Sequence, residues 1–486
     1  MVSRLLSNVL SDFGGRVVHV ISTGVLLIFL TRTLGPELYG LLALAISIFA
    51  TARFFSESGL PRSAARYIAQ FKEDDPGTAF RTVLESWKLL AVAAAVVSLA
   101  LAALSEPVAT HLDEPALAPL LVVGSGYVFF YSIHTHHRFV MQGFEAIAAS
   151  AKVHSLEGAC TLVFVVGLVL YDPTPLSAVT GYVLGYAVAA VAGFVVVYRL
   201  TTGIDASDSS RGTVRAKILT YNVPMSVTRL SDEVDQELDT VLVGFFTNPT
   251  QVAFYTLGKQ ISQFTRVPAA SIGFALSPTY GSEQASGQLE QATEVYQESL
   301  SKTLILYVPA VAGILAIADV AIPTIFGEGY ADGVLVVRVL ALFVLFEALE
   351  QISGPALDYL GRARSRAVLK SVTSFGNLGL NLVLIPLYGA AGAAAATVVT
   401  FGLYAVCSVA IVYTELPFDP RRVGISLSKV AGISLVMGTS VYGLTDALTG
   451  YASLVLGVGV GVAIWLLACH LFGLLDFRRL LVQLRG

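Results

Sequence analysis

The chain has 486 residues, of which 55% are hydrophobic and only 13% are charged, and its mean hydropathy is +0.73. Soluble domains carry about 25% charged residues, so this much apolar surface does not fit a water-soluble core. The net charge of −4 comes without the clustered basic surface that binding to nucleic acid requires. The three cysteines lie in apolar runs and lack metal-ligand spacing. We therefore expect an all-α integral membrane protein with no nucleic-acid partner.

Apolar windows of about 20 residues predict fourteen transmembrane helices. The predicted spans are 9–33, 38–60, 86–105, 116–136, 149–171, 177–199, 218–246, 250–276, 302–325, 333–353, 365–387, 390–413, 424–446 and 451–474. Glycine and proline separate several of them, for example at 34–36 and 386–389. The first eleven residues lack the apolar core of a signal peptide, so we expect no cleaved leader.

The basic residues of the loops are distributed unequally between the two sides of the membrane. One side holds nearly all of them, including Arg62, Arg66, Arg364 and Arg421, whereas the opposite loops contain only Arg32. Short loops rich in Lys and Arg stay in the cytoplasm. The sequence therefore predicts a multi-pass protein of the cell membrane with both termini in the cytoplasm.

Landmarks in the first half recur in the second half in the same order. Gly143, Ala149, Lys152 and Gly158 match Gly361, Ala367, Lys370 and Gly376, each 218 positions later. A repeat of six spans enters the membrane in the same direction each time, so its copies are related by a pseudo-two-fold axis along the membrane normal. We predict an N-lobe at 1–200, a C-lobe at 217–415, two extra C-terminal helices at 420–475 and a cytoplasmic tail at 476–486.

Several segments carry a family resemblance that covers essentially the whole chain. Residues 30–40 read LTRTLGPELYG, 60–67 read LPRSAARY, 238–246 read LDTVLVGFF, 361–364 read GRAR, and 381–397 read NLVLIPLYGAAGAAAAT. The chain resembles the polysaccharide-transport branch, with Wzx-type flippases and archaeal relatives, of the multidrug/oligosaccharidyl-lipid/polysaccharide flippase superfamily. The resemblance implies two six-helix lobes, alternating access, and transport of a polyprenyl- or dolichyl-linked phosphate or diphosphate oligosaccharide to the outer leaflet.

Four cations within predicted spans are candidates for binding the substrate: Arg16, Arg53, Lys259 and Arg266. Charges inside a membrane are costly unless they face a cavity or a partner. Guanidinium and ammonium groups can replace the hydration of a phosphate headgroup as it leaves water. The spacing of Arg53 and Glu57 equally allows a local ion pair.

Span 7 holds a dense charge cluster, and spans 11 and 12 add polar side chains. Asp235 and Asp239 share a helical stripe, while Asn377 and Asn381 are one turn apart on span 11. The resemblance to lipid II flippases implies a sodium or proton site formed by Asp235 or Asp239 with Asn377, Asn381 and Thr397. A purely structural polar network between helices is the alternative.

The remaining ionisable residues in spans are weaker candidates for a functional role. His134, His136 and His137 lie at a cytoplasmic span end, and we interpret them as interfacial histidines rather than metal ligands. His154 and Glu157 are expected to pair locally, and Glu347 and Glu350 are candidate proton carriers or partners of Arg338.

The expected partners are a lipid-linked oligosaccharide, membrane lipids and enzymes of glycan assembly, with the chain itself a monomer. No cofactor other than the coupling ion is expected. A multidrug or cation antiporter of the same fold is the alternative function. A membrane polymerase or glycosyltransferase is disfavoured because the outer loops are short and no nucleotide-binding glycine loop is present. We therefore expect a transporter rather than an enzyme.

Overall fold

The computed structural model describes residues 2–207, 212–220, 222, 237–285, 289–448 and 450–474. Side chains are described over the same ranges except 2–19, 267, 271–272 and 274–285. The described residues are helical and contain no strand, as predicted. Nine of the described helices are long and apolar enough to cross a membrane. The predicted total of fourteen and the symmetry of the lobes stay predictions.

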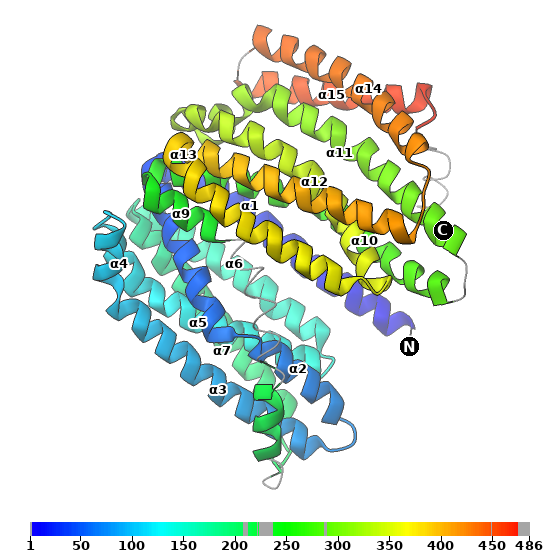
Figure 1. Ribbon diagram of the computed structural model, residues 1–486. Coiled ribbons are helices and arrows are strands. Elements are labelled where there is room, and N and C mark those ends of the chain that lie inside the picture. Colours follow the sequence, from blue (N-terminus) through cyan, green and yellow to red (C-terminus); the bar gives the residue numbers. More distant parts are fainter. Residues whose placement is uncertain are drawn as a thin grey trace. The chain divides into compact units, whose positions relative to one another are not determined.

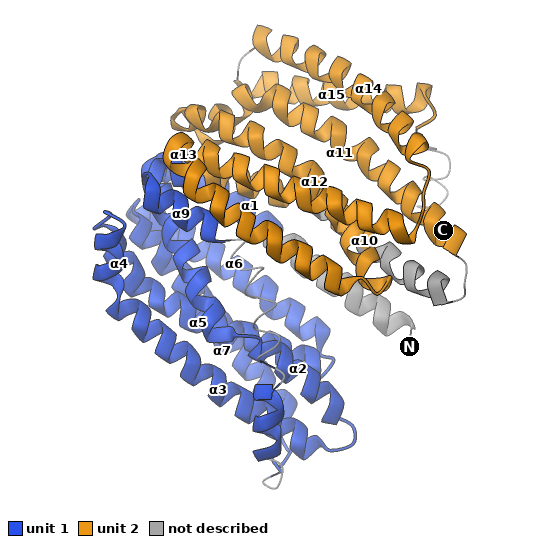
Figure 2. Cartoon of the chain, viewed as in Figure 1, with its two compact units in different colours: residues 1–253 blue, residues 254–486 orange. Residues whose placement is uncertain are grey.

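Two compact units divide the chain after Ala253 (Figure 2). Unit 1 contains α1 (Val2–Glu57), α2 (Leu60–Phe71), α3 (Pro76–Ala103), α4 (Ser105–His111), α5 (Leu117–Gly143), α6 (Ile147–Tyr171), α7 (Pro175–Thr201) and α9 (Asp239–Phe246). The helix α10 (Pro249–Ala285) begins at the boundary. Unit 2 continues with α11 (Leu289–Phe326), the 3-10 helix η2 (Glu328–Gly333), α12 (Val334–Tyr359), α13 (Ala363–Glu415), α14 (Pro420–Ala447) and α15 (Gly450–Leu471).

In unit 1, α5, α6 and α7 lie side by side, and α1 packs against α5 and α6 (Figure 1). Small residues permit the contact between α6 and α7. A Cβ atom built on Gly181 would lie 2.6 Å from the Cα atom of Val165, and one on Gly185 would lie 2.7 Å from the Cα atom of Thr161. Close backbone approach of this kind is how helices pack in membranes, where no hydrophobic effect drives their association.

The short amphipathic α2 precedes α3, whose start is fixed by a capping residue. The Asp75 carboxylate accepts a hydrogen bond of 2.9 Å from the Thr78 backbone N–H, and Pro76 occupies the first helical position. Hydrogen bonds from Thr78 lower the pKa of Asp75. Asp75 and Pro76, on the predicted cytoplasmic side, therefore fix the residue at which α3 begins.

In unit 2, α11 contacts α12 on one side and α14 and α15 on another (Figure 1). The Trp465 indole donates a hydrogen bond of 3.2 Å to the Ile305 carbonyl oxygen and so ties α15 to α11. An apolar groove of about 590 Å³ runs between α11, α12 and α14, with Val311, Leu342 and Tyr442 among its lining residues.

Two of the predicted breaks lie at single glycines, where two helical segments meet at a kink without an intervening loop. In α1 the kink is at Gly35, with φ 74° and ψ 175°, and in α13 it is at Gly389, with φ 59° and ψ −139°. Only glycine adopts such backbone angles without strain. The Gly/Ala run that follows allows the two helical segments to approach closely. A Cβ atom on Gly392 would lie 2.1 Å from the Leu384 carbonyl oxygen across the kink.

Candidate functional site

Arg53 is held in unit 1 by tyrosine side chains. Its guanidinium carbon lies 3.8 Å from the centre of the Tyr131 ring, a cation–π geometry. The Tyr131 and Tyr186 rings are 4.8 Å apart, and Tyr127 and Tyr186 are 5.1 Å apart, so residues of α5 and α7 form an aromatic wall. Glu57, one turn along α1, attracts Arg53 electrostatically. Arg53 is thus a fixed, half-buried cation within the helices.

Sequence reasoning identified the arginine but missed the tyrosine side chains around it. Tyr127 and Tyr131 are one turn apart on α5, and Tyr182 and Tyr186 are one turn apart on α7. Paired tyrosines at this spacing on two spans, α5 and α7, were the available signal. Of the other predicted cations, Arg16 lies in α1, but its side chain is outside the described residues.

Lys259 and Arg266 lie on α10 in unit 2. One guanidinium nitrogen of Arg266 donates a hydrogen bond of 3.1 Å to Glu347 Oε1 on α12. The Arg266 side chain is still 49% exposed within the described chain, whereas the Glu347 side chain is only 8% exposed. Arg266 therefore has a buried carboxylate on one side and accessible space on the other.

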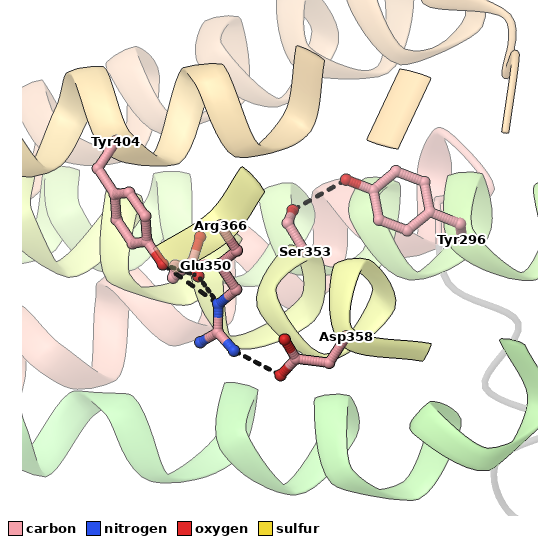
Figure 3. Close-up of polar contacts among 6 residues, drawn as sticks. All are labelled: Tyr296, Glu350, Ser353, Asp358, Arg366 and Tyr404. Carbon is pink, nitrogen blue, oxygen red and sulfur yellow. Dashed lines mark hydrogen bonds and ion pairs between the residues drawn. The ribbon is translucent and has the colours of Figure 1, made fainter. Parts of the chain in front are cut away.

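A second ion-pair network joins α12 to α13 in unit 2 (Figure 3). Glu350 Oε1 accepts hydrogen bonds from the Tyr404 hydroxyl at 2.7 Å and from Arg366 Nε at 3.2 Å. The same arginine donates a hydrogen bond of 2.5 Å to Asp358. Separately, the Ser353 hydroxyl of α12 lies 2.9 Å from the Tyr296 hydroxyl of α11. The Lys370 ammonium lies 5.0 Å from the ring centres of both Phe401 and Tyr404.

The predicted pairing of Glu347 or Glu350 with Arg338 is wrong. Arg338 forms its ion pair with Asp319 on α11, while Glu347 pairs with Arg266 and Glu350 with Arg366. The reason is distance along α12. Glu347 and Glu350 are nine and twelve positions from Arg338, which is about two and a half to three turns of the helix. The cationic partners come from other helices instead.

The polar residues of spans 11 and 12 form a hydrogen-bonded row on α13. Asn381 donates to Asn377 at 2.8 Å, and Asn377 donates to the Thr400 hydroxyl at 3.2 Å. Thr397 lies 3.2 Å from the Tyr255 hydroxyl of α10. Asn377 and Asn381 are both buried. The structure therefore brings together the two asparagines and adds Thr400, which sequence reasoning did not single out.

The acidic half of the predicted ion site belongs to the other unit. Asp239 is buried at the start of α9 in unit 1, and Asp235 lies outside the described residues. A site that combines Asp239 with Asn377, Asn381 and Thr397 stays a prediction.

The three histidines of α5 are buried rather than interfacial, which corrects the expectation from their position in the chain. His136 lies 3.0 Å from the Ser86 hydroxyl, and the His137 ring lies 6.1 Å from the Phe194 ring. His134 faces α6, where the expected pair of His154 and Glu157 is confirmed with a distance of 3.1 Å.

Comparison with known proteins places the chain in a family. A family model described as "polysaccharide biosynthesis protein" matches residues 5–282, and the MatE family model matches residues 224–387. A Haloferax volcanii protein named as a probable low-salt glycan biosynthesis flippase, Agl15, is 23% identical over 47% of this chain and 48% of its own length. The match thus spans about half of that relative. A Shigella flexneri protein whose name assigns it to O-antigen transport is 22% identical over 75% of this chain and 87% of its own length.

The fold is similar to that of solved transporters. The inward closed structure of the lipid II flippase MurJ superposes with a TM-score of 0.76 at 13% identity, covering 98% of this chain and all of that one. At this identity the likeness concerns the fold alone. The match of the polysaccharide biosynthesis model over more than half of the sequence shows that the chain belongs to the polysaccharide biosynthesis protein family, a group of membrane transporters in the multidrug/oligosaccharidyl-lipid/polysaccharide flippase superfamily.

Proposed function

We propose that this chain is a flippase that moves a lipid-linked oligosaccharide, on a polyprenyl or dolichyl phosphate or diphosphate, from the cytoplasmic to the outer leaflet by alternating access. The observation that carries this proposal is Arg53, a guanidinium fixed by Tyr131 within membrane-spanning helices. A phosphate headgroup crossing the membrane loses its hydration, and a guanidinium held in place offers charge-assisted hydrogen bonds as a replacement. Arg266 offers a second guanidinium in unit 2.

The two parts of such a substrate require different surroundings. The headgroup is anionic and carries sugars, which suit cations flanked by tyrosines, because aromatic faces pack against sugar rings and hydroxyls accept hydrogen bonds. The hydrocarbon chain suits an apolar surface such as the groove between α11, α12 and α14. The relatives named for glycan flipping and O-antigen transport support the same substrate class.

Transport is tested with purified protein in liposomes that contain a polyprenyl diphosphate-linked oligosaccharide and a glycan probe restricted to the outer face. We expect translocation above the level of protein-free vesicles. Replacing Arg53 by Gln removes a charged hydrogen-bond donor worth about 1.5–3 kcal/mol, so the rate should fall about tenfold or more. Arg266→Gln should act in the same direction.

The matched control is Arg364→Gln, which removes an exposed cation in the first turn of α13. Its rate should equal that of the unchanged protein. Wild-type protein that moves no more glycolipid than empty vesicles would disprove the proposal, and equal losses in the control would show that net charge, not the site, matters.

The MatE match favours a second candidate, a multidrug or cation antiporter. Such a protein uses intramembrane acids and does not need Arg53 or Arg266. Drug efflux that persists in both arginine variants, with no glycolipid transport in any form, would support this alternative.

We further propose coupling to sodium or protons through Asp239 with Asn377, Asn381 and Thr397. Carboxylate, amide and hydroxyl oxygens suit a hard cation. Asp239→Asn removes the charge with little change in shape. Flipping that responds to a sodium or proton gradient in the wild type but not in this variant supports the site, and equal responses in both proteins contradict it.

A further inference from the structure

Three potential metal ligands converge between two helices of unit 1. His134 comes from α5, and His154 and Glu157 come from the first half of α6. One ligand atom from each residue lies within 4.8 Å of those from the other two. The short connection 144–146 between the helices makes this meeting possible, because it keeps α5 and α6 antiparallel neighbours. His154 and Glu157, three residues apart, share a face of α6.

His134 is the unusual member of this group. Its side chain is only 2% exposed, and neither ring nitrogen has a hydrogen-bond partner among the described residues. A buried polar group without a partner costs free energy, so most buried histidine nitrogens are bonded. His136, on the same helix, has a partner in Ser86. The ring nitrogens of His137 also lack a hydrogen-bond partner among the described residues, but His137 belongs to no group of three potential ligands there. A ring nitrogen of His134 instead lies within 4.8 Å of ligand atoms of Glu157 and His154, which is a suitable position for a metal ligand.

We propose that His134, His154 and Glu157 bind a divalent transition-metal ion of the zinc class. Two imidazoles and one carboxylate are a donor set that zinc accepts readily, whereas sodium and magnesium prefer oxygen ligands alone. Ligand atoms of a bound ion lie about 3–3.5 Å apart, given bonds of about 2.0–2.2 Å. The Nδ1–carboxylate distance of 3.1 Å already meets this spacing. The His134 ring needs only a small movement.

Three protein ligands leave a coordination position open for water or another oxygen. The Tyr186 ring packs edge-on against His134, with 5.8 Å between ring centres, and also contacts Tyr131, the residue beneath Arg53. The ion would therefore fix the α5–α6 pair directly behind the wall that holds Arg53. This role is independent of the identity of the transported glycan.

The test is zinc binding by the full chain, purified with a tag that lacks histidine. The probes are Zn²⁺ for metal content and affinity and Co²⁺ for the absorption spectrum of a coordinated ion. We expect about one ion per chain, with loss of thermal stability when a chelator removes it. His154→Gln should weaken binding at least about tenfold, since even outer-shell changes cost 10–100-fold.

The primary variant is His154→Gln, because its side chain is 16% exposed and the change disturbs packing least. Glu157→Gln is the second, and it keeps the shape of the side chain. The control is His137→Gln, a buried histidine one turn along α5 that lies outside the group. Elution as one species in gel filtration verifies folding.

The proposal is supported if the control binds zinc like the wild type and both cluster variants do not. It is overturned if folded wild-type protein binds no zinc, or if His154→Gln and the control bind it equally. In those cases His154 and Glu157 form an ion pair and nothing more. Glycolipid transport is not the readout, so this result is separate from that of the proposed function.

Discussion

At the scale of single residues, Glu350 is a buried carboxylate of unit 2 with two side-chain hydrogen-bond donors. It accepts hydrogen bonds from Tyr404 and Arg366 while 5% exposed. Glu350→Gln keeps the shape but removes the charge, so Arg366 loses its buried partner. We expect a loss of about 1–3 kcal/mol, below the full value for a buried pair because the Arg366 side chain is 32% exposed. Thermal unfolding in detergent measures it.

The same arginine supplies the control. Asp358→Asn removes its exposed partner, whose side chain is 45% accessible, and should cost about 0–1 kcal/mol. Equal losses in the two variants would show that burial does not decide the strength of this network. A larger loss of stability for Asp358→Asn would mean that the exposed pair of Arg366 and Asp358 contributes more than the buried one.

Single residues were the level at which sequence reasoning succeeded least. It selected Arg53, Arg266 and Asn377 because charges and amides inside spans need a partner or cavity. It could not assign those partners. Arg266 is 81 positions from Glu347, and Tyr404 is 54 positions from Glu350, so only the fold brings them together. Pairs one turn apart, such as His154 with Glu157, were within reach.

At the scale of elements, the kink in α13 can be tested with three glycines. Gly389→Ala forces a Cβ atom into a backbone conformation reserved for glycine, and Gly392→Ala places one against the Leu384 carbonyl. Each should destabilise the protein by about 1–3 kcal/mol. Gly376, on the same helix with nothing within 4 Å, is the control, and its change to Ala should be neutral or stabilise by up to about 1 kcal/mol.

Unfolding midpoints of the three variants in detergent decide between backbone strain and packing. If Gly389→Ala matches Gly376→Ala, the kink imposes no demand for glycine. If Gly392→Ala is harmless, the two halves of α13 can separate without loss.

Element boundaries were predictable because the membrane fixes the length of an apolar run and proline and glycine mark its ends. The breaks at Gly35 and Gly389 were predicted at the right positions, but not their form: one glycine with positive φ joins two helical segments without a loop. Hydropathy reports which residues prefer lipid, not the angle at which a helix leaves a kink.

At the scale of the whole molecule, class and fold followed from composition and apolar periodicity, because hydrocarbon admits only helices with internally paired backbones or closed barrels. The proposed site residues did not follow in the same way. Arg53 and Asp239 belong to one unit, and Arg266 and Asn381 belong to the other. A site of this kind depends on the arrangement of whole lobes, on which local sequence patterns carry no information.

The predicted topology is the property of the whole molecule on which the direction of transport depends. Single cysteines are introduced at the partly exposed Glu114 and at the exposed Glu328, Arg364 and Arg421, after Cys160, Cys407 and Cys469 are replaced by Ala. Retention of basic loops in the cytoplasm predicts that a membrane-impermeant maleimide labels Glu114→Cys and Glu328→Cys on intact cells. Arg364→Cys and Arg421→Cys should react only after the cells are opened. The reverse pattern would invert the chain, and a mixed one would change the number of spans between the labelled sites. The reverse pattern would place the basic loops on the outer face and contradict outward flipping driven from a cytoplasmic binding site.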